Sequence, residues 1–375
     1  MSFFSYIFIG EIMKKILICL IFLFIFTPLT VKGFETSASA AILMDMDSGR
    51  ILYSKQIHLR RSVASISKIM TAILAIESGN LETIITVGDE INDAYGSGIY
   101  IKKGEQIKLK DLLYGLMLRS GNDAALAIAN YVGGNVDSFV NMMNEKAKQI
   151  GMKNSEFNNP SGLDEDEGNY STAYDMAILT SYAMKNDIYQ SIVSTKKHKV
   201  KTNLNYYEWT NKNKLLFTYN YLTGGKTGFT EIAKRTLVTT ASKNDLNLVV
   251  VTLNDGNDFA DHKSLYDEAF SVFSNYKILQ SGSINIPGET YYKRDTLFLN
   301  NDFTYPFLDS ELSQVTIKYS LNKLREYSDN QVVGKAEVYI NKELVNTSEI
   351  YVTTNKNKEQ KNIFEKILDW IKSLW

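Results

Sequence analysis

The order of apolar and polar positions in the first half of the chain predicts a hairpin followed by several helices. Residues 41–53 alternate loosely around Asp47-Ser48-Gly49, which predicts a hairpin with a glycine-containing turn. From residue 65 to 78 apolar side chains recur every three or four positions, which predicts a helix that stops at Gly79. More helices and a loop are predicted downstream, the helices over 112–118, 124–132 and 137–150 and the loop over 158–162.

The pattern changes to strands in the second half of the chain. Residues 237–240 and 248–253 are β-branched runs, typical of adjacent strands in a core sheet. Helical spacing returns over 262–273, and residues 288–353 are strand-like and largely free of helix. We therefore predict an α+β fold, in which an antiparallel sheet flanked by helices is followed by a small β-sandwich. The predicted domain boundaries are 39–280 for the first part and 281–354 for the second.

The N-terminus has the pattern of an exported protein. Lys14 and Lys15 precede an unbroken apolar run over 16–26, and small residues follow over 37–40. This order predicts a secretory signal peptide over about residues 1–38, because the run is shorter than the roughly 20 residues that a spanning helix needs. A buried core helix is the alternative. The signal places the mature protein in the cell-wall space, at the outer face of the cytoplasmic membrane.

The C-terminal segment, residues 355–375, is predicted to be a polar linker followed by an amphipathic helix. Its apolar side chains share one helical face: Ile363, Phe364, Ile367, Leu368, Trp370, Ile371, Leu374 and Trp375. Lysines and acidic residues occupy the other face, and such a helix with two tryptophans suits the plane of a membrane interface. The alternative is a helix packed on the protein's own core. The polar linker favours an anchor on the membrane surface.

Charge and cysteine content exclude several classes of function. Lys plus Arg number 41 and Asp plus Glu 42, with no basic stripe, so we expect no nucleic-acid partner. The only cysteine, Cys19, lies inside the predicted signal peptide. A mature chain without a thiol has no disulfide framework, no cysteine nucleophile and no cysteine-based zinc site. No cofactor or metal is expected.

Three short motifs hold the chemistry, although two of them are common by themselves. Ser65-Ile66-Ser67-Lys68 is an S-x-x-K and Ser120-Gly121-Asn122 an S-x-N, and both patterns recur elsewhere in the chain. Lys226-Thr227-Gly228 occurs once. The order of the three motifs and their structural setting are therefore the stronger signal.

The spacing of Ser65 and Lys68 suits a nucleophile and its base. A serine at the start of a helix lies beside backbone N–H groups and the positive end of the helix dipole. Lys68 follows one turn later on the same face, within reach of the hydroxyl. A lysine can activate a serine once it loses its proton, and burial and a second cation both lower its pKa. Lys226 is the expected second cation.

Geometry distinguishes the remaining motifs from a competing match. Ser78-Gly79-Asn80 lies thirteen residues from Ser65, which is about 20 Å along a helix, so we exclude it. Residues 120–122 interrupt two predicted helices and can face the site from a loop. The glycines of residues 224–228 precede a predicted strand, where they allow a peptide substrate to approach an edge strand closely.

A Ser-His-Asp hydrolase is the alternative to the Ser-Lys pair. His58, His198 and His262 are the only histidines, and none stands near a G-x-S-x-G pattern or in an H-E-x-x-H pattern. The Ser-Lys interpretation is therefore preferred.

The motifs together resemble a known family. Residues 63–72, 118–125 and 225–230 resemble the active-site signatures of low-molecular-mass penicillin-binding proteins, the serine D-alanyl-D-alanine carboxypeptidases. The resemblance covers roughly residues 40–275 and implies a β-lactamase/transpeptidase-like domain. Residues 253–255 and 261–263 resemble the sporulation-associated branch of this family.

The resemblance implies a reaction and its catalytic residues. The enzyme would hydrolyse the terminal D-Ala-D-Ala bond of peptidoglycan stem pentapeptides, which limits cross-linking, and β-lactams would acylate it. Ser65 would be the acylated nucleophile, Lys68 its proton acceptor, and Ser120 a proton relay to the leaving D-alanine. The N–H groups of Ser65 and Phe229 would form the oxyanion hole. The implied substrate-binding residues are Asn122, Lys226, Thr227 and Gly228.

The sequence differs from the family pattern at two positions, and it is compatible with two other functions. Lys234 and Asn169 stand where relatives often have glycine and histidine, and no further arginine can be assigned to the substrate carboxylate. A serine β-lactamase would need a base for deacylation, and Glu165 and Glu167 lie in a suitable loop but without a Glu-x-x-Leu-Asn pattern. A wall-binding protein with a decayed site is the other rival.

Overall fold

The first part of the chain is built on a five-stranded antiparallel sheet. A computed structural model describes residues 33–164 and 168–354, and all elements below lie in the compact unit that starts at Thr36. The strand order is β2-β1-β11-β10-β9, so β9 lies at an edge. The strands are β1 (Ala40–Asp45), β2 (Ile51–Lys55), β9 (Leu222–Thr230), β10 (Lys234–Lys243) and β11 (Leu246–Leu253).

The β-branched runs form the buried centre of this sheet. β10 and β11 pair in register, with Val238 opposite Val251, and both side chains are fully buried. β1 and β2 form the predicted hairpin around residues 46–50. The predictions of adjacent central strands and of an N-terminal hairpin are confirmed.

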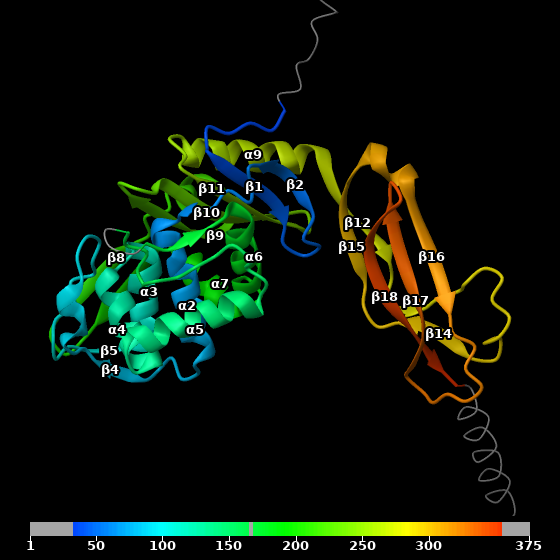
Figure 1. The fold of residues 1–375 in the computed structure, drawn as a ribbon, viewed down its shortest axis with the longest axis horizontal. Helices are drawn as coiled ribbons and strands as arrows, with labels where there is room; N and C mark the ends of the chain where they lie inside the picture. Colours follow the sequence, from blue (N-terminus) through cyan, green and yellow to red (C-terminus); the bar gives the residue numbers. More distant parts are fainter. Residues whose placement is uncertain (1–32, 165–167, 355–375) are drawn as a thin grey trace, which may run out of the picture. The chain divides into compact units, whose positions relative to one another are not determined.

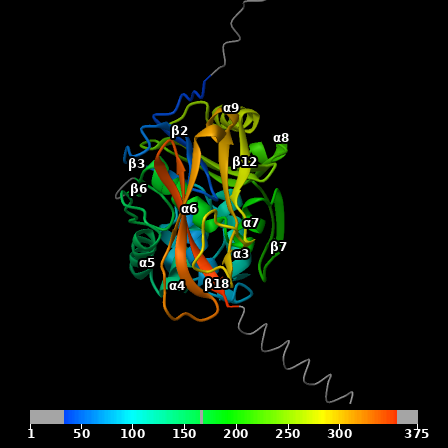
Figure 2. The same cartoon turned by 90° about the vertical axis from the view of Figure 1, so that its right-hand side faces the viewer.

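Helices cover both faces of the sheet. In both views α9 lies on one side, and α3, α4 and α5 lie on the other (Figure 1, Figure 2). The longer helices are α2 (Lys68–Glu77), α3 (Leu109–Arg119), α4 (Asn122–Gly133), α5 (Val136–Gln149), α6 (Ala173–Ala183), α7 (Asp187–Val193) and α9 (Asp258–Val272). Short turns of helix are η1 (Ala64–Ser67), η2 (Asp89–Asp93) and α8 (Leu215–Thr218). The helix predicted from residue 65 becomes a regular α-helix only at Lys68, because residues 64–67 form a 3-10 turn.

Three two-stranded ribbons connect these helices. They are β3 (Arg61–Ser62) with β6 (Tyr170–Ser171), β4 (Ile84–Thr86) with β5 (Gln106–Lys108), and β7 (Lys197–Lys201) with β8 (Tyr206–Thr210). The β3–β6 ribbon has a direct bearing on the site, since it precedes η1 and is continued by a bond from the Val63 N–H to the Asn169 carbonyl at 3.1 Å.

The second part of the chain is a β-sandwich, as predicted. One sheet has the order β13-β14-β18-β17-β16 and the other pairs β12 with β15. The strands are β12 (Phe273–Leu279), β13 (Gly282–Ser283), β14 (Thr296–Leu299), β15 (Phe303–Leu308), β16 (Val315–Leu321), β17 (Gln331–Ile340) and β18 (Glu343–Thr353), with a 3-10 turn η3 (Asp309–Gln314). Leu279 of the small sheet packs in one cluster with Leu297, Val338 and Ile350 of the large sheet.

The predicted α+β fold class is confirmed for the described residues. The predicted boundary between residues 280 and 281 is crossed by strand pairing, because β12 precedes it and β15 follows it. Most of the predicted signal peptide and the amphipathic helix over 361–375 lie outside the described residues. Within 33–164 and 168–354, no helix combines the length and apolar character needed to cross a membrane.

Candidate active site

Ser65 lies in the 3-10 turn that leads into α2, and strand β10 holds this turn in place. The Thr236 hydroxyl donates a hydrogen bond to the Val63 carbonyl at 2.9 Å, which fixes the start of the turn against the sheet. Ala64 adopts a left-handed backbone with φ of +51°. Ser65 is left half-buried, with its hydroxyl 3.1 Å from the Lys68 amine. The turn therefore presents the serine to solvent and to the lysine at once.

Lys68 is fully buried and surrounded by acceptors. Its Nζ also bonds Asn122 Oδ1 at 2.6 Å and the Ser161 carbonyl. The pKa of Lys68 is lowered to about 7, mainly by burial and also by the nearby Lys212 charge, while the Asp123 charge acts in the opposite direction. The amine is therefore half neutral near pH 7 and can act as a base. The cation whose charge lowers the pKa of Lys68 is Lys212, whereas the charge interaction between Lys68 and Lys226 lowers the pKa of Lys226.

Ser120 and Asn122 flank the break between α3 and α4. Ser120 ends α3 in a left-handed conformation with φ of +60°, and Asn122 begins α4. The Asn122 amide donates to the Tyr95 carbonyl at 2.6 Å, while its backbone N–H donates to the Ser97 carbonyl at 2.8 Å. The predicted interruption at 120–122 is present and brings both side chains to the Ser65–Lys68 pair.

Lys226 connects the edge strand β9 to Ser120. Its Nζ donates to the Ser120 hydroxyl and to the Thr227 carbonyl, the latter at 2.6 Å. Its side chain is 1% exposed, and burial together with the charges of Lys68 and Lys212 holds its pKa well below the usual value. Two serine–lysine pairs thus face each other, Ser65 with Lys68 and Ser120 with Lys226.

Gly228 allows β9 to approach the nucleophile closely. A Cβ at this position would lie 3.1 Å from the Ser65 backbone nitrogen and would overlap the Thr236 hydroxyl. Only glycine fits between the strand and the turn without displacing one of them. The third motif therefore lies against the first, as its predicted role requires.

These residues surround an open cavity of about 440 Å³. It is lined by predicted site residues, namely Ser65, Ser120, Thr227, Gly228 and Phe229. Lys68, Asn122 and Lys226 are buried next to it and bonded to its serines or to one another. The structure thus brings together every residue that the sequence nominated.

The same cavity has lining residues that the sequence analysis missed, namely Ser97, Lys212, Arg235, Asp258 and Phe259. Lys212 donates to the Ser97 hydroxyl at 3.0 Å, and partial burial and Arg119 lower its pKa. No motif or periodicity marks Lys212, since it reaches the cavity from a loop after β8.

Asp123, a carboxylate outside the predicted site residues, stabilises the segment next to the cavity. Asp123 accepts hydrogen bonds from the N–H groups of Ile99 at 3.0 Å and Tyr100 at 2.6 Å, and from Ala124 at 2.9 Å. It thereby ties the segment that carries Ser97 to the start of α4. In the sequence, only the position of Asp123 next to Asn122 indicates this function.

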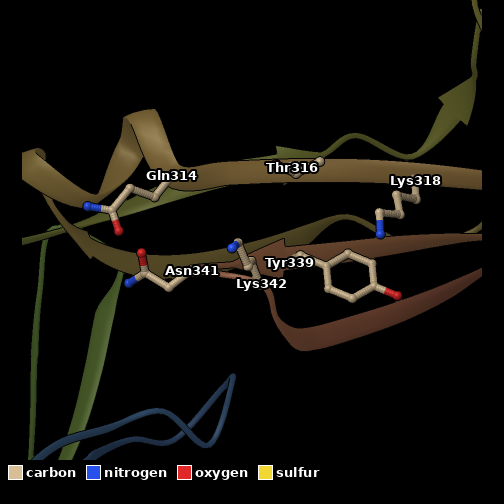
Figure 3. A pocket seen from close by; sticks show the side chains of 6 residues that line it. All are labelled: Gln314, Thr316, Lys318, Tyr339, Asn341 and Lys342. Carbon is tan, nitrogen blue, oxygen red and sulfur yellow. The ribbon is translucent and has the colours of Figure 1, made fainter.

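A second depression, of about 500 Å³, lies on the β-sandwich (Figure 3). Its side chains are Gln314, Thr316, Lys318, Tyr339, Asn341 and Lys342. The Lys318 ammonium lies 4.5 Å from the centre of the Tyr339 ring, and both lysines are exposed. Without a buried base beside a hydroxyl, this depression offers no comparable nucleophile.

The histidines do not support a Ser-His-Asp site. His262 is buried between the Thr239 hydroxyl at 2.7 Å and the Thr252 hydroxyl at 3.0 Å, and burial lowers its pKa to about 3. His198 bonds Asp111 at 2.7 Å. Neither they nor His58 line the cavity at Ser65.

Comparisons with known proteins agree with this geometry. The sequence profile of the family described as D-alanyl-D-alanine carboxypeptidase matches residues 27–257. The chain belongs to this family. It is 34% identical to the D-alanyl-D-alanine carboxypeptidase DacF of Bacillus subtilis over 250 residues, which span 64% of this chain and 64% of that relative. It is 28% identical to the carboxypeptidase DacC of Escherichia coli, with 93% of each chain covered.

Solved structures of penicillin-binding proteins share the fold. Penicillin binding protein 5 of Haemophilus influenzae aligns with a TM-score of 0.73 and 26% identity, over 85% of this chain and 97% of that one. The D-alanyl-D-alanine carboxypeptidase of Mycobacterium tuberculosis aligns with a TM-score of 0.61 and 28% identity, over 64% and 92%. The predictions of a low-molecular-mass penicillin-binding protein and of a serine-type D-alanyl-D-alanine carboxypeptidase are confirmed.

Asn169 and Lys234, the two positions that differ from the expected family pattern, both have defined contacts in the structure. Asn169 is buried, and its side chain accepts from the Asn158 N–H at 2.8 Å and donates to the Asn159 carbonyl at 2.8 Å. It thus holds the loop that carries Ser161. Lys234 is exposed and pairs with Glu231 at 3.3 Å. Assignment to the sporulation-associated branch stays a prediction, and Glu165 and Glu167 of the β-lactamase rival lie outside the described residues.

Proposed function

We propose that this chain removes the terminal D-alanine from peptidoglycan stem pentapeptides through an acyl-enzyme on Ser65. The main support is the fully buried Lys68 amine, with a pKa of about 7, 3.1 Å from the hydroxyl of a serine that lines an open cavity. A positioned serine beside a neutral amine is suited to nucleophilic acyl transfer. The same step makes β-lactams acylating inhibitors.

Acylation begins with the neutral form of Lys68. Its two N–H groups can donate to Asn122 Oδ1 and to the Ser161 carbonyl, which leaves the lone pair for the Ser65 hydroxyl. As Ser65 Oγ attacks the carbonyl carbon of the penultimate D-alanine, its proton passes to Lys68. The negative charge that develops on the carbonyl oxygen is stabilised by the N–H groups of Ser65 and Phe229.

The leaving D-alanine needs a proton on its nitrogen. The proton that Lys68 took from Ser65 passes through the Ser120 hydroxyl, which is bonded to Lys226, to this nitrogen as the C–N bond breaks, so Lys68 becomes neutral again. A water molecule then attacks the ester with Lys68 again as base, which releases the shortened peptide and restores Ser65.

The substrate is held along the edge strand. An extended peptide can add to β9, whose outer side is unpaired in the sheet. Thr227 and the cations Lys226 and Lys212 bind the terminal carboxylate at one end. The Asn122 amide, which has one N–H on the Tyr95 carbonyl, has a second N–H for the peptide backbone.

The direct test is release of D-alanine from a pentapeptide that ends in D-Ala-D-Ala. We expect release from this peptide, none from the same peptide ending in L-Ala-L-Ala, and loss of release after one equivalent of benzylpenicillin. Rapid turnover of the penicillin would favour a β-lactamase instead. A protein that neither releases D-alanine nor forms an adduct would be a binding protein, and the proposal would fail.

The proposal extends to the place of action, which is the cell-wall space at the membrane surface. Removing residues 361–375, which lie outside the described residues, is expected to move the mature protein from the membrane to the soluble fraction. D-alanine release from a soluble peptide should persist, because the cavity residues lie between Ser65 and Phe259. Sedimentation after expression measures the shift. A full-length variant with Ile367→Glu and Trp370→Glu is the matched control, since it disrupts only the apolar face; sedimentation of either variant with membranes would contradict the anchor.

A further inference from the structure

An arginine that belongs to none of the three motifs lies in the active-site cavity. Arg235 lies on β10 directly opposite Phe229 of β9, and both line the cavity. Directly opposed residues on paired strands have Cβ atoms about 4.5–5.5 Å apart, so the two side chains share one face of the sheet. Arg235 is therefore next to the strand position that follows Gly228, where β9 meets the nucleophile.

Asp258 holds the Arg235 guanidinium in a fixed orientation. Arg235 Nε donates to Asp258 Oδ2 at 3.1 Å and Nη2 donates to Oδ1, and the guanidinium carbon lies 5.5 Å from the centre of the Phe259 ring. The Asp258 side chain is 5% exposed and that of Arg235 is 46% exposed. Both residues line the cavity, but the cation is the exposed partner of the pair and the carboxylate is almost fully buried.

The Arg235 guanidinium has N–H groups that Asp258 does not use. A guanidinium has five N–H groups, and within the described residues Nη1 has no hydrogen-bond partner. The ion pair raises the pKa of Arg235, so the charge is permanent. A fixed, charged fork with free N–H groups in a substrate cavity is suited to a carboxylate.

The path of the substrate identifies which carboxylate this is. The terminal carboxylate is assigned to the Lys226 end of β9, where Lys212 also acts on the pKa of Lys226. An extended chain advances about 3.3 Å per residue, so a peptide antiparallel to β9 carries the residue before D-Ala-D-Ala past Phe229 toward Thr230. That residue lies on the side of the scissile bond where Arg235 is found.

We infer that Arg235 binds a carboxylate on the side chain of the substrate residue that precedes D-Ala-D-Ala. This inference rests on the proposed function and names its substrate class: stem peptides whose third residue carries a free side-chain carboxylate. A third residue whose side chain ends only in an ammonium is repelled by the Arg235 cation, because the Asp258 carboxylate is almost fully buried. An amidated side chain lacks the negative charge.

The test compares three pentapeptides that differ only at the third residue: meso-2,6-diaminopimelate, its side-chain amide, and L-lysine. For the wild-type protein we expect kcat/KM for D-alanine release to be about 10-fold or more higher with the free carboxylate than with the amide. In Arg235→Gln this ratio should fall to near 1, and in Arg235→Lys to an intermediate value. Lys234→Gln, which removes the neighbouring exposed cation, should keep the wild-type ratio.

Two controls separate a loss of substrate preference from a loss of folded protein. Because Arg235→Gln leaves the Asp258 carboxylate buried without its partner, the double variant with Asp258→Asn is measured as well. Stoichiometric labelling by penicillin shows that each variant is folded. Equal kcat/KM for the carboxylate and amide peptides in the wild type, or an equal loss on all three peptides in Arg235→Gln, would overturn the inference. Release from none of the peptides by the wild type would instead overturn the proposed function.

Discussion

Replacing Lys68 with alanine is expected to slow acylation of Ser65 by a β-lactam by at least about 10²–10⁴-fold, the usual contribution of a general base. The Lys68 amine is the only buried base bonded to the Ser65 hydroxyl among the described residues. Stopped-flow measurement of penicillin adduct formation checks this, with Ser65→Ala as the variant that has no nucleophile.

The pH dependence of the wild type provides an independent readout of the same base. Since the pKa of Lys68 is about 7 and the active form is neutral, the acylation rate should rise as pH increases through about 7 and level off above it. Lys68→Arg keeps a cation at this position but stays protonated, so it should remain inactive at every pH between 6 and 9. A flat wild-type profile, or normal labelling of Lys68→Ala, would exclude Lys68 as the base.

Lys68→Ala should keep its fold, because the buried amine is costly for the folded state. Its pKa is 10.5 in the unfolded chain and about 7 in the folded one, so below pH 7 the difference destabilises the fold by on the order of 5 kcal/mol. This cost declines as pH rises from about 7 toward 10.5. Removing the lysine removes this destabilisation, which offsets the loss of its hydrogen bonds. A reactive base at this position therefore lowers the stability of the fold.

The sequence predicted the parts of the site that depend on local geometry. Ser65 and Lys68 are three residues apart, so one helical turn places them on the same face, and in the structure their polar atoms lie 3.1 Å apart. Residues 120–122 interrupt two apolar helical segments, so a break there follows from the pattern alone. The β-branched runs predict adjacent strands for a similar reason, since only a sheet centre buries both faces of such strands.

The sequence could not predict contacts that depend on long-range packing. Lys212 acts on the pKa of Lys68 although 144 positions separate them, and its own loop has no regular pattern. Arg235 reaches the cavity because β10 pairs with β9, and it is fixed there by Asp258, which the sequence analysis placed before its predicted helix. Lys68 also donates to the Ser161 backbone carbonyl, and a backbone acceptor cannot be predicted from the type of residue.

That carbonyl belongs to a loop whose position depends on one glycine. Gly162 has a φ of +82°, and a Cβ there would overlap the Ala64 carbonyl oxygen and lie 2.5 Å from the Ser67 hydroxyl oxygen. The loop is shaped by Asn159, whose Oδ1 accepts from the N–H groups of Ser161 at 3.1 Å and Gly162 at 2.6 Å. The loop thus packs without a gap against the turn that carries the nucleophile.

Gly162→Ala is therefore expected to lower the free energy of unfolding by about 2–5 kcal/mol, the sum of a left-handed backbone penalty and overpacking. Gly104→Ala is the matched control, because Gly104 has a φ of +80° but nothing within 4 Å of its Cβ position, and it should cost only about 1–2 kcal/mol. Urea unfolding of both variants measures the difference. Because relief of the overlap must shift the Ser161 carbonyl or the Ser65 turn, Gly162→Ala alone should also slow acylation by penicillin. Equal stability and equal acylation rates for the two variants would show that this close contact does not hold the loop against the nucleophile.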